Sequence, residues 1–198
     1  MDIAQPEKAQ AFMKAVGVVE PKHLVTTHKH LDHSGGNDEM KKTFPNLKIY
    51  GGKDDDIASV TQEINHLDKQ TIGGLEMTAL HTPCHTRGHI LFYFEGAEGQ
   101  KLEYTKTVEN GYVKVSNVDR LVFTGDTIFL GGCGRFFEGQ PHEMVTSLDL
   151  AMAHLPDDAK VFCGHEYTEA NIKFCLKAEP SNTDLLESKL KHYLDQKQ

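Results

Sequence analysis

The run Thr27-His28-Lys29-His30-Leu31-Asp32-His33 places four metal-ligand side chains within seven residues. His28 and His30 are two positions apart, so they can project the same way from an extended or tightly turned segment. Asp32 and His33 follow at once and must point elsewhere. One short loop can therefore offer two ligands to each of two ions. Imidazole and carboxylate donors suit zinc, iron and manganese.

Three later segments also hold a His or an Asp beside Gly or Pro at a tight turn, after a strand-like apolar stretch: 82–89, 123–127 and 162–167. Glycine at such turns lets the backbone come close to an ion or a substrate. Unrelated histidines would not gather at turns in this way. The four turns together supply the candidate metal ligands His28, His30, Asp32, His33, His85, Asp126 and His165.

The segments that must position these turns alternate between strand and helix patterns. Strands are predicted at 22–26, 47–50, 75–81, 89–94, 120–124 and 160–163, and helices at 6–16, 37–44, 141–155, 168–175 and 184–194. The polar segment 95–119 is predicted to be a long hairpin at the surface. Strands that end in ligand loops predict an α/β sandwich with the site along one edge.

The His-x-His-x-Asp-His run and the later single His, Asp and His motifs resemble the metallo-β-lactamase superfamily. Narrower strings, at Thr82–Thr86, Gly132–Phe136 and Gly164–Tyr167, are similar to the glyoxalase II (hydroxyacylglutathione hydrolase) family. The resemblance runs from about Ala4 to about Leu190. It implies a metallo-β-lactamase-like αββα sandwich, with two mixed sheets face to face and helices outside.

The same resemblance divides the chain into a catalytic domain at residues 1–176 and residues 177–198, which would be the start of a truncated C-terminal helical region. Family members have more strand sequence before the first helix and a longer helical C-terminal domain. We therefore expect this chain to lack the first strands and most of that domain. The basic residues that the C-terminal domain supplies for the glutathione carboxylates would then be missing too.

By resemblance, the site holds two divalent ions, with zinc preferred over iron or manganese. His28, His30 and His85 would hold one ion, and Asp32, His33 and His165 would hold the other. Asp126 would bridge the two ions. The implied reaction is hydrolysis of S-(2-hydroxyacyl)glutathione, such as S-lactoylglutathione, to D-lactate and glutathione, a step in methylglyoxal detoxification. A hydroxide held between two cations would attack the thioester, and Asp32 would orient the attacking oxygen.

Substrate contacts are expected, by resemblance, from two segments that touch glutathione in the family: Arg135, Phe136 and Phe137, and His165, Glu166 and Tyr167. Arg135 could pair with a glutathione carboxylate. Phe137 stands where the family often carries Tyr, so one hydrogen bond is expected to be absent. His89 lies next to a ligand motif, and we expect it to hydrogen-bond a ligand or the backbone.

Composition limits the remaining function classes. The formal net charge of −8 argues against nucleic-acid binding. No apolar stretch reaches the roughly 18 residues of a membrane span, and no signal peptide is visible. Four separated cysteines are expected to be free thiols. We expect a monomeric cytoplasmic protein that binds a small glutathione thioester, with a mitochondrial location left open if the N-terminus is incomplete.

Two other interpretations remain open from the sequence. One is another enzyme of the superfamily, either a persulfide dioxygenase with one iron or a β-lactamase. The other is a truncated, non-catalytic form that binds metal but cannot hold substrate. The Arg135–Phe137 and Gly164–Tyr167 strings favour the thioesterase over the other enzymes of the superfamily.

Overall fold

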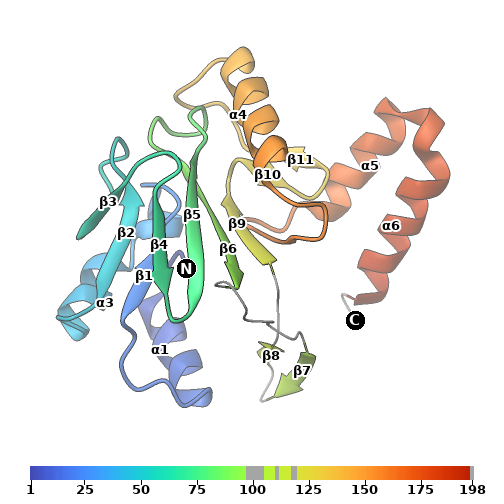
Figure 1. Cartoon of the computed structure of the whole chain (residues 1–198). Helices are drawn as coiled ribbons and strands as arrows, with labels where there is room; N and C mark the ends of the chain where they lie inside the picture. Colours follow the sequence, from blue (N-terminus) through green and yellow to red (C-terminus); the bar gives the residue numbers. More distant parts are fainter. Residues whose placement is uncertain (97–104, 110–111, 117–119, 197–198) are drawn as a thin grey trace.

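Two β-sheets form the centre of the molecule (Figure 1). The computed structural model describes residues 1–96, 105–109, 112–116 and 120–196. The first sheet has the order β1-β2-β3 and is wholly parallel, with Leu24 opposite Ile49 and Tyr50 opposite Gln62. Its strands are β1 (His23–Val25), β2 (Lys48–Gly52) and β3 (Gln62–Ile64).

The second sheet is mixed and has the order β12-β9-β6-β5-β4. Its strands are β4 (Lys69–Ile72), β5 (Leu75–His81), β6 (Ile90–Gly96), β9 (Arg120–Gly125) and β12 (Lys160–Cys163). Only β9 and β12 pair in parallel. Two antiparallel pairs complete the strands, β7 (Thr105–Glu109) with β8 (Tyr112–Ser116), and β10 (Ile128–Phe129) with β11 (Gly132–Cys133).

The helices are α1 (Pro6–Ala15), α2 (Leu31–Ser34), α3 (Asn37–Thr43), α4 (Pro141–His154), α5 (Thr168–Ala178) and α6 (Thr183–Gln196). Helix α4 starts with a capping box, in which the Gln140 N–H donates to Glu143 Oε2 at 2.8 Å, and Pro141 occupies its first turn. None of the described helices is both long and apolar enough to cross a membrane.

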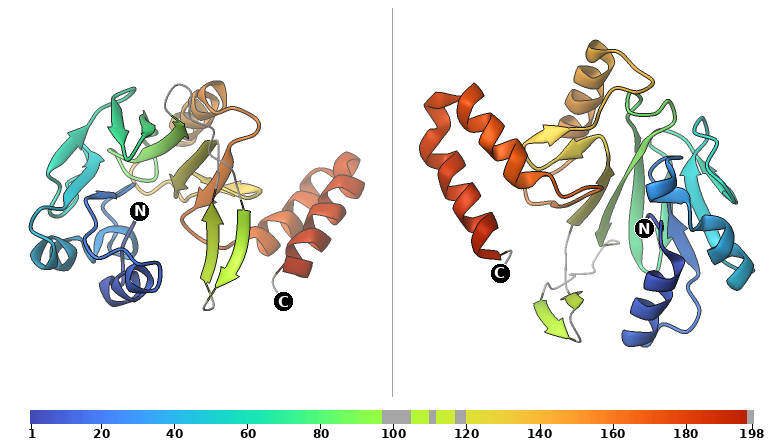
Figure 2. Two further views of the ribbon diagram at one scale, coloured as in Figure 1. Left: turned by 60° about the horizontal axis from the view of Figure 1, so that its bottom comes forward. Right: turned by 180° about the vertical axis from the view of Figure 1, so that it is seen from behind.

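Three hydrophobic cores lie between four layers, and each of the two sheets, the inner layers, alternates its side chains between two of these cores. Leu24, Met40, Leu47 and Ile49 fill the space between the first sheet and helices α1 and α3. Val25, Tyr50, Met77, Phe92 and Phe94 fill the space between the sheets, while Leu80, Leu91, Tyr93 and Ala151 join the second sheet to α4. Figure 2 shows the helices outside the paired sheets. This alternation is the period-two pattern of strands buried on both faces.

The sandwich prediction is confirmed, with one correction. The first sheet is not mixed but parallel, because β1, β2 and β3 are joined by crossovers rather than hairpins. Most predicted elements differ from the observed ones by one to three residues at their ends, and α2, β3, β4, β10 and β11 had not been predicted. Of the predicted excursion at 95–119, residues 95–96 belong to β6, and residues 105–109 and 112–116 form the antiparallel pair β7–β8. The remaining residues of this segment lie outside the described ones.

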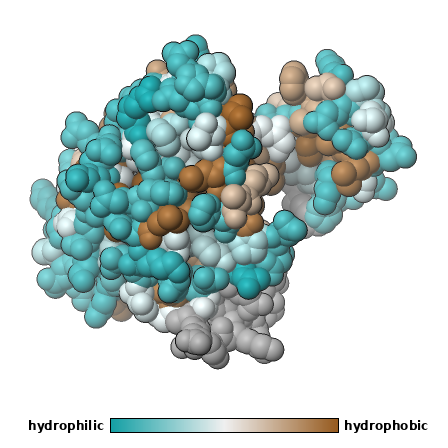
Figure 3. Space-filling model, turned by 45° about the horizontal axis from the view of Figure 1, so that its top comes forward, coloured by the Kyte–Doolittle hydropathy of each residue, from teal (hydrophilic) through white to brown (hydrophobic). Residues whose placement is uncertain are grey.

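Helices α5 and α6 pack against one another and stand to one side of the sandwich (Figures 1 and 3). Hydrophobic side chains remain exposed on this helix pair, including Phe174 and Leu185. The predicted domain division after residue 176 falls within α5.

Phe92 on the central strand β6 is fully buried in the core between the sheets. Replacing it by Ala removes most of a large side chain from a close-packed core, so Phe92→Ala should lower the free energy of unfolding by about 3–5 kcal/mol. Urea denaturation followed by circular dichroism measures the change.

The matched control is Met152→Ala on α4, whose side chain is 71% exposed; it should change the free energy of unfolding by less than about 0.5 kcal/mol. Equal effects of the two substitutions would contradict the assignment of the core.

Candidate metal centre

The seven predicted ligands all lie in segments that follow strand ends, on one edge of the two sheets. His28 and His30 follow β1, Asp32 and His33 lie on the short helix α2, and the other three follow β5, β9 and β12: His85, Asp126 and His165. The structure therefore brings together residues that are up to 137 positions apart in the sequence, from His28 to His165. Strand ends at a sheet edge are where α/β proteins commonly bind ligands.

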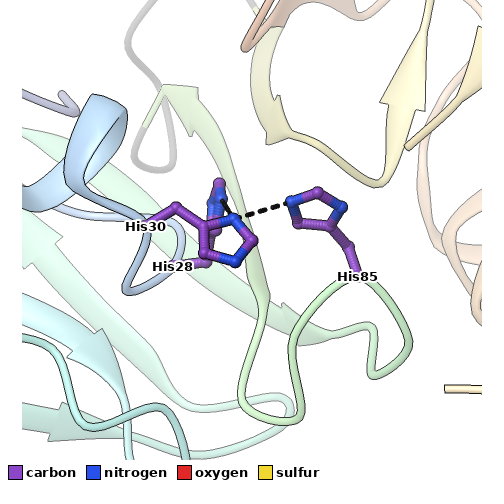
Figure 4. A group of neighbouring side chains, drawn as sticks. All are labelled: His28, His30 and His85. Atoms are coloured by element: carbon purple, nitrogen blue, oxygen red, sulfur yellow. Dashed lines mark hydrogen bonds between the residues drawn. The ribbon is translucent and has the colours of Figure 1, made fainter. Parts of the chain in front are cut away.

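Three imidazoles form the first group. His30 Nδ1 lies 3.0 Å from both His28 Nε2 and His85 Nε2. Figure 4 shows the rings of His28 and His30, from the loop after β1, pointing toward the ring of His85 from the β5–β6 loop. Two nitrogens bound to one tetrahedral zinc ion lie about 3.3 Å apart. These three residues are close enough to serve as ligands of one ion.

Asp32, His33 and His165 form the second group. His165 Nε2 lies 3.3 Å from His33 Nε2 and 3.2 Å from Asp32 Oδ2. The group is less enclosed than the first, because the side chain of Asp32 is 59% exposed whereas that of His85 in the first group is 4% exposed. One side of the second group is thus open to solvent.

Asp126 lies between the two groups. Its Oδ1 is 3.2 Å from His33 Nε2, and its Oδ2 is 3.3 Å from His165 Nε2 and 3.5 Å from His85 Nε2. Oδ1 is buried, and the His33 ring is its one partner within the described residues. Burying a carboxylate carries a desolvation cost, and a cation bound beside this oxygen would reduce it. The donor set and this carboxylate both fit divalent metal ions.

Glycines permit this close approach. Gly125 adopts a φ of +47°, and a Cβ there would lie 2.6 Å from His89 Nε2 and from Thr27 Oγ1. A Cβ on Gly164 would meet Asp126 Oδ1 and would lie 2.7 Å from His33 Cε1. Any other residue at either position would displace the groups that face the centre.

The imidazoles do not share one protonation state. Burial lowers the pKa of His28, and the neighbouring histidines His89 and His33 lower it further. Burial also lowers the pKa of His85. For His33, burial acts in the same direction, but the hydrogen bonds to Asp126 and Asp2 outweigh it and raise its pKa to about 10.

Hydrogen bonds from Nδ1 of two rings to surrounding groups direct the Nε2 atoms of those rings toward the centre. The Nδ1 of His85 donates to the Arg135 carbonyl at 2.8 Å, which leaves Nε2 free to face His30. The Nδ1 of His33 donates to Asp2 Oδ2 at 2.8 Å, which directs its Nε2 toward Asp126. Such partners fix the tautomer and the orientation of a metal-ligating histidine.

His89 makes the backbone hydrogen bond that was expected of it. It is fully buried, and burial lowers its pKa to about 3, so the ring is neutral. Its Nε2 accepts from the Asp126 N–H at 3.1 Å, so Nδ1 carries the proton and faces Thr82 Oγ1 and Thr127 Oγ1, both at 3.1 Å. His89 therefore holds the backbone of the residue that joins the two groups.

Asp2 is a supporting residue that the sequence did not reveal. Besides contacting His33, its carboxylate accepts hydrogen bonds from the Thr27 N–H and hydroxyl, both at 2.7 Å. It lies 25 residues before Thr27 and belongs to no recognisable motif. Only the close approach of the N-terminal segment to β1, where the Asp2 N–H donates to the Val25 carbonyl, reveals it.

Three of the residues predicted to contact substrate, Arg135, Phe137 and Tyr167, lie beside the candidate ligands. The Phe137 ring lies edge-on to His30 and His85, with centroids 5.5 and 5.2 Å away, and the Arg135 guanidinium lies 5.3 Å from the Phe137 centroid. Tyr167 stacks on His165 at 5.3 Å. Phe136 is partly exposed, and Glu166 Oε1 accepts from the Thr168 N–H at 3.0 Å at the start of α5.

Comparisons with known proteins agree with this geometry. The model of the metallo-β-lactamase superfamily matches residues 5–98. A cytoplasmic hydroxyacylglutathione hydrolase of Arabidopsis thaliana is 42% identical over 181 residues, which cover 91% of this chain and 60% of that protein. A hydroxyacylglutathione hydrolase-like protein of Gallus gallus is 36% identical over 92% of this chain and 58% of its own length.

Among solved structures, ETHE1 from Myxococcus xanthus superposes with a TM-score of 0.62 at 23% identity, covering 84% of this chain and 63% of that one. This similarity concerns the fold. The chain is therefore similar to the metallo-β-lactamase superfamily in sequence over residues 5–98 and in its overall fold. The chain spans about 60% of the length of the Arabidopsis relative.

The raised pKa of His33 predicts that metal uptake releases protons. Near pH 8 the ring of His33 is mostly protonated in the metal-free protein, since its pKa is about 10. A metal ion must displace that proton, whereas His28 and His85 are already neutral. Zinc titration calorimetry at pH 8, in two buffers with different ionisation enthalpies, should show about one proton released from His33 per chain.

Asp2→Asn is the control, because it removes one of the two carboxylates that raise the His33 pKa and should reduce the number of protons released. An apparent binding enthalpy that is the same in both buffers would contradict the charged state of His33.

Proposed function

We propose that this chain is a metal-dependent thioesterase that hydrolyses S-(2-hydroxyacyl)glutathione, with S-lactoylglutathione as the representative substrate. The observation that carries the proposal is the pair of adjacent ligand groups with the Asp126 carboxylate between them. The names of relatives that are 36–42% identical support the choice of substrate. A cytoplasmic location and a monomeric state are part of the same proposal.

We propose the ligand division that the family resemblance implies. The first ion would be held by His28, His30 and His85, and the second by Asp32, His33 and His165. Asp126 would bridge them, since its Oδ1 faces the second group and its Oδ2 faces both. Imidazole and carboxylate donors suit zinc, and they also accept iron or manganese. We propose zinc, with the other two ions as substitutes that depend on availability.

When bound, such ions lower the pKa of water and polarise the carbonyl group of a substrate. The protein would supply the orientation. Asp32 is the one exposed carboxylate of the two groups, and its Oδ2 lies 3.2 Å from His165 Nε2, so it can accept a hydrogen bond from the attacking water. No serine or cysteine nucleophile is required, because the attacking atom comes from solvent.

The glutathione portion would bind beside the first group. Arg135 would pair with a glutathione carboxylate, and Tyr167 would donate its hydroxyl to a peptide oxygen. Phe136 and Phe137 would form an apolar wall, since Phe137 lies against His30 and His85 and has no hydroxyl to donate. His165 and Glu166, together with Tyr167, would form the side of the substrate site that adjoins the second group.

Hydrolysis of S-lactoylglutathione by the 198-residue chain tests the proposal directly. We expect turnover that a chelator abolishes and that added zinc restores. Absence of turnover in a folded sample with two ions bound would contradict the proposed substrate. Oxygen uptake with glutathione persulfide would then indicate a one-iron dioxygenase.

Asp126→Ala should remove both ions together, because one carboxylate faces both groups. Metal content after dialysis should fall from two ions per chain toward none, and the hydrolysis rate should fall with it. Asp149→Ala, at an exposed position of α4, is the matched control and should keep both ions and full activity. Full metal content in Asp126→Ala would exclude the bridging role.

A further inference from the structure

Asp55 is a buried carboxylate that belongs to neither ligand group. It lies in the turn after β2, between two exposed aspartates, Asp54 and Asp56, and has no solvent exposure of its own. Burying a carboxylate is costly unless hydrogen bonds compensate for the lost water. Its partners therefore indicate what the structure gains from it.

Both oxygens of Asp55 accept backbone hydrogen bonds, and the two donors lie on different ligand loops. Oδ2 accepts from the Lys29 N–H at 2.7 Å, and Lys29 lies between the ligands His28 and His30. Oδ1 accepts from the Gly88 N–H at 3.0 Å, three residues after His85. The Asp55 carboxylate thus joins two loops of the first ligand group. One loop carries His28 and His30, and the other carries His85.

Two glycines bring the Asp55 turn into direct backbone contact with the second of these loops. A Cβ on Gly88 would collide with the backbone of Asp54 and Asp55, and a Cβ on Gly52 would collide with the Gly88 carbonyl. The turn and the loop therefore have no freedom to move closer. The hydrogen bonds of Asp55 prevent them from moving apart.

Glu138 joins the same two loops on the more exposed side. Its Oε1 lies 2.7 Å from the Lys29 ammonium, and its Oε2 accepts from the Arg87 N–H at 2.8 Å. Both side chains of the ion pair are about one-third exposed, at 33% and 30%, so this bridge is weaker than the buried one. Two carboxylates thus hold residue 29 and residues 87–88 together from opposite sides.

We propose that Asp55 is a positioning residue for the first metal site, fixing the separation between His28 and His30 on one loop and His85 on the other. The inference rests on the ligand groups proposed above. Asp55 acts by accepting hydrogen bonds from backbone N–H groups, so asparagine cannot replace it. An amide would direct its NH2 toward one of the two N–H donors, and that loop would move away.

Cobalt binding to the metal-free full chain tests this role, because cobalt absorbs visible light according to its ligands. Asp55→Asn should weaken binding at the first site by roughly 10- to 100-fold and leave the second site unchanged. Its one-cobalt spectrum should match that of His85→Ala, which removes a first-group ligand, and not that of His165→Ala. Asp54→Asn makes the same charge change at the neighbouring exposed residue and should keep two sites of normal affinity.

Loss of both sites to the same extent in folded Asp55→Asn, or retention of both, would overturn the positioning role. If Asp55→Asn does not fold, Glu138→Gln decides the question, since the proposal requires it to weaken the first site by a smaller factor and to leave the second site unchanged. An equal effect of Glu138→Gln on both sites, or none, would then overturn it. Fewer than two cobalt ions in the wild-type chain would instead contradict the proposed ligand groups themselves.

Discussion

The Asp126 carboxylate has to lie within about 3.5 Å of imidazoles from both groups, and much of the surrounding backbone is arranged to make that possible. Gly125 and Gly164 have no Cβ that would occupy this space. His89 holds the Asp126 N–H, and the parallel pairing of β12 with β9 brings the strand that ends before His165 alongside the strand that ends before Asp126. The sandwich provides the rigid edge on which these short segments meet.

The charge distribution explains why such a cluster is suited to cations. Several imidazoles in contact cannot all be protonated without mutual repulsion, and burial favours neutral rings at His28, His85 and His89. His33 is the exception, since it lies between the carboxylates of Asp2 and Asp126. The metal-free cluster therefore combines neutral imidazole donors with a buried carboxylate and one charged ring. A bound cation would accept the neutral donors and the carboxylate, and it would take the place of the proton on His33.

Sequence patterns predicted the parts of the site that depend on local structure. A β-branched or apolar strand followed by a Gly-containing turn identified the positions of His28, His85, Asp126 and His165 before any tertiary information. The helical periodicity of 6–16 and 141–155 gave α1 and α4 to within about one residue. These signals are local, because each depends on the repeat of one strand or helix and on the turn that ends it.

The parts that were not predicted depend on contacts between distant segments. Strands β3 and β4 are short and mostly exposed, so they carry no alternating apolar pattern. Asp2 acquires its role only through its approach to Thr27 and His33. Asp55 lies in a run of three aspartates that reads as a solvated turn, and only tertiary structure buries the middle one. The parallel pairing of the first sheet likewise cannot be read from separate strand patterns.

We propose that two adjacent ligand groups share Asp126. Anomalous diffraction at the zinc edge, from crystals of the zinc-loaded chain, tests this sharing. We expect two peaks about 3.5–4 Å apart, one beside His28, His30 and His85 and the other beside His33 and His165, with the Asp126 carboxylate in contact with both. A single peak, or a second peak away from Asp126, would contradict it.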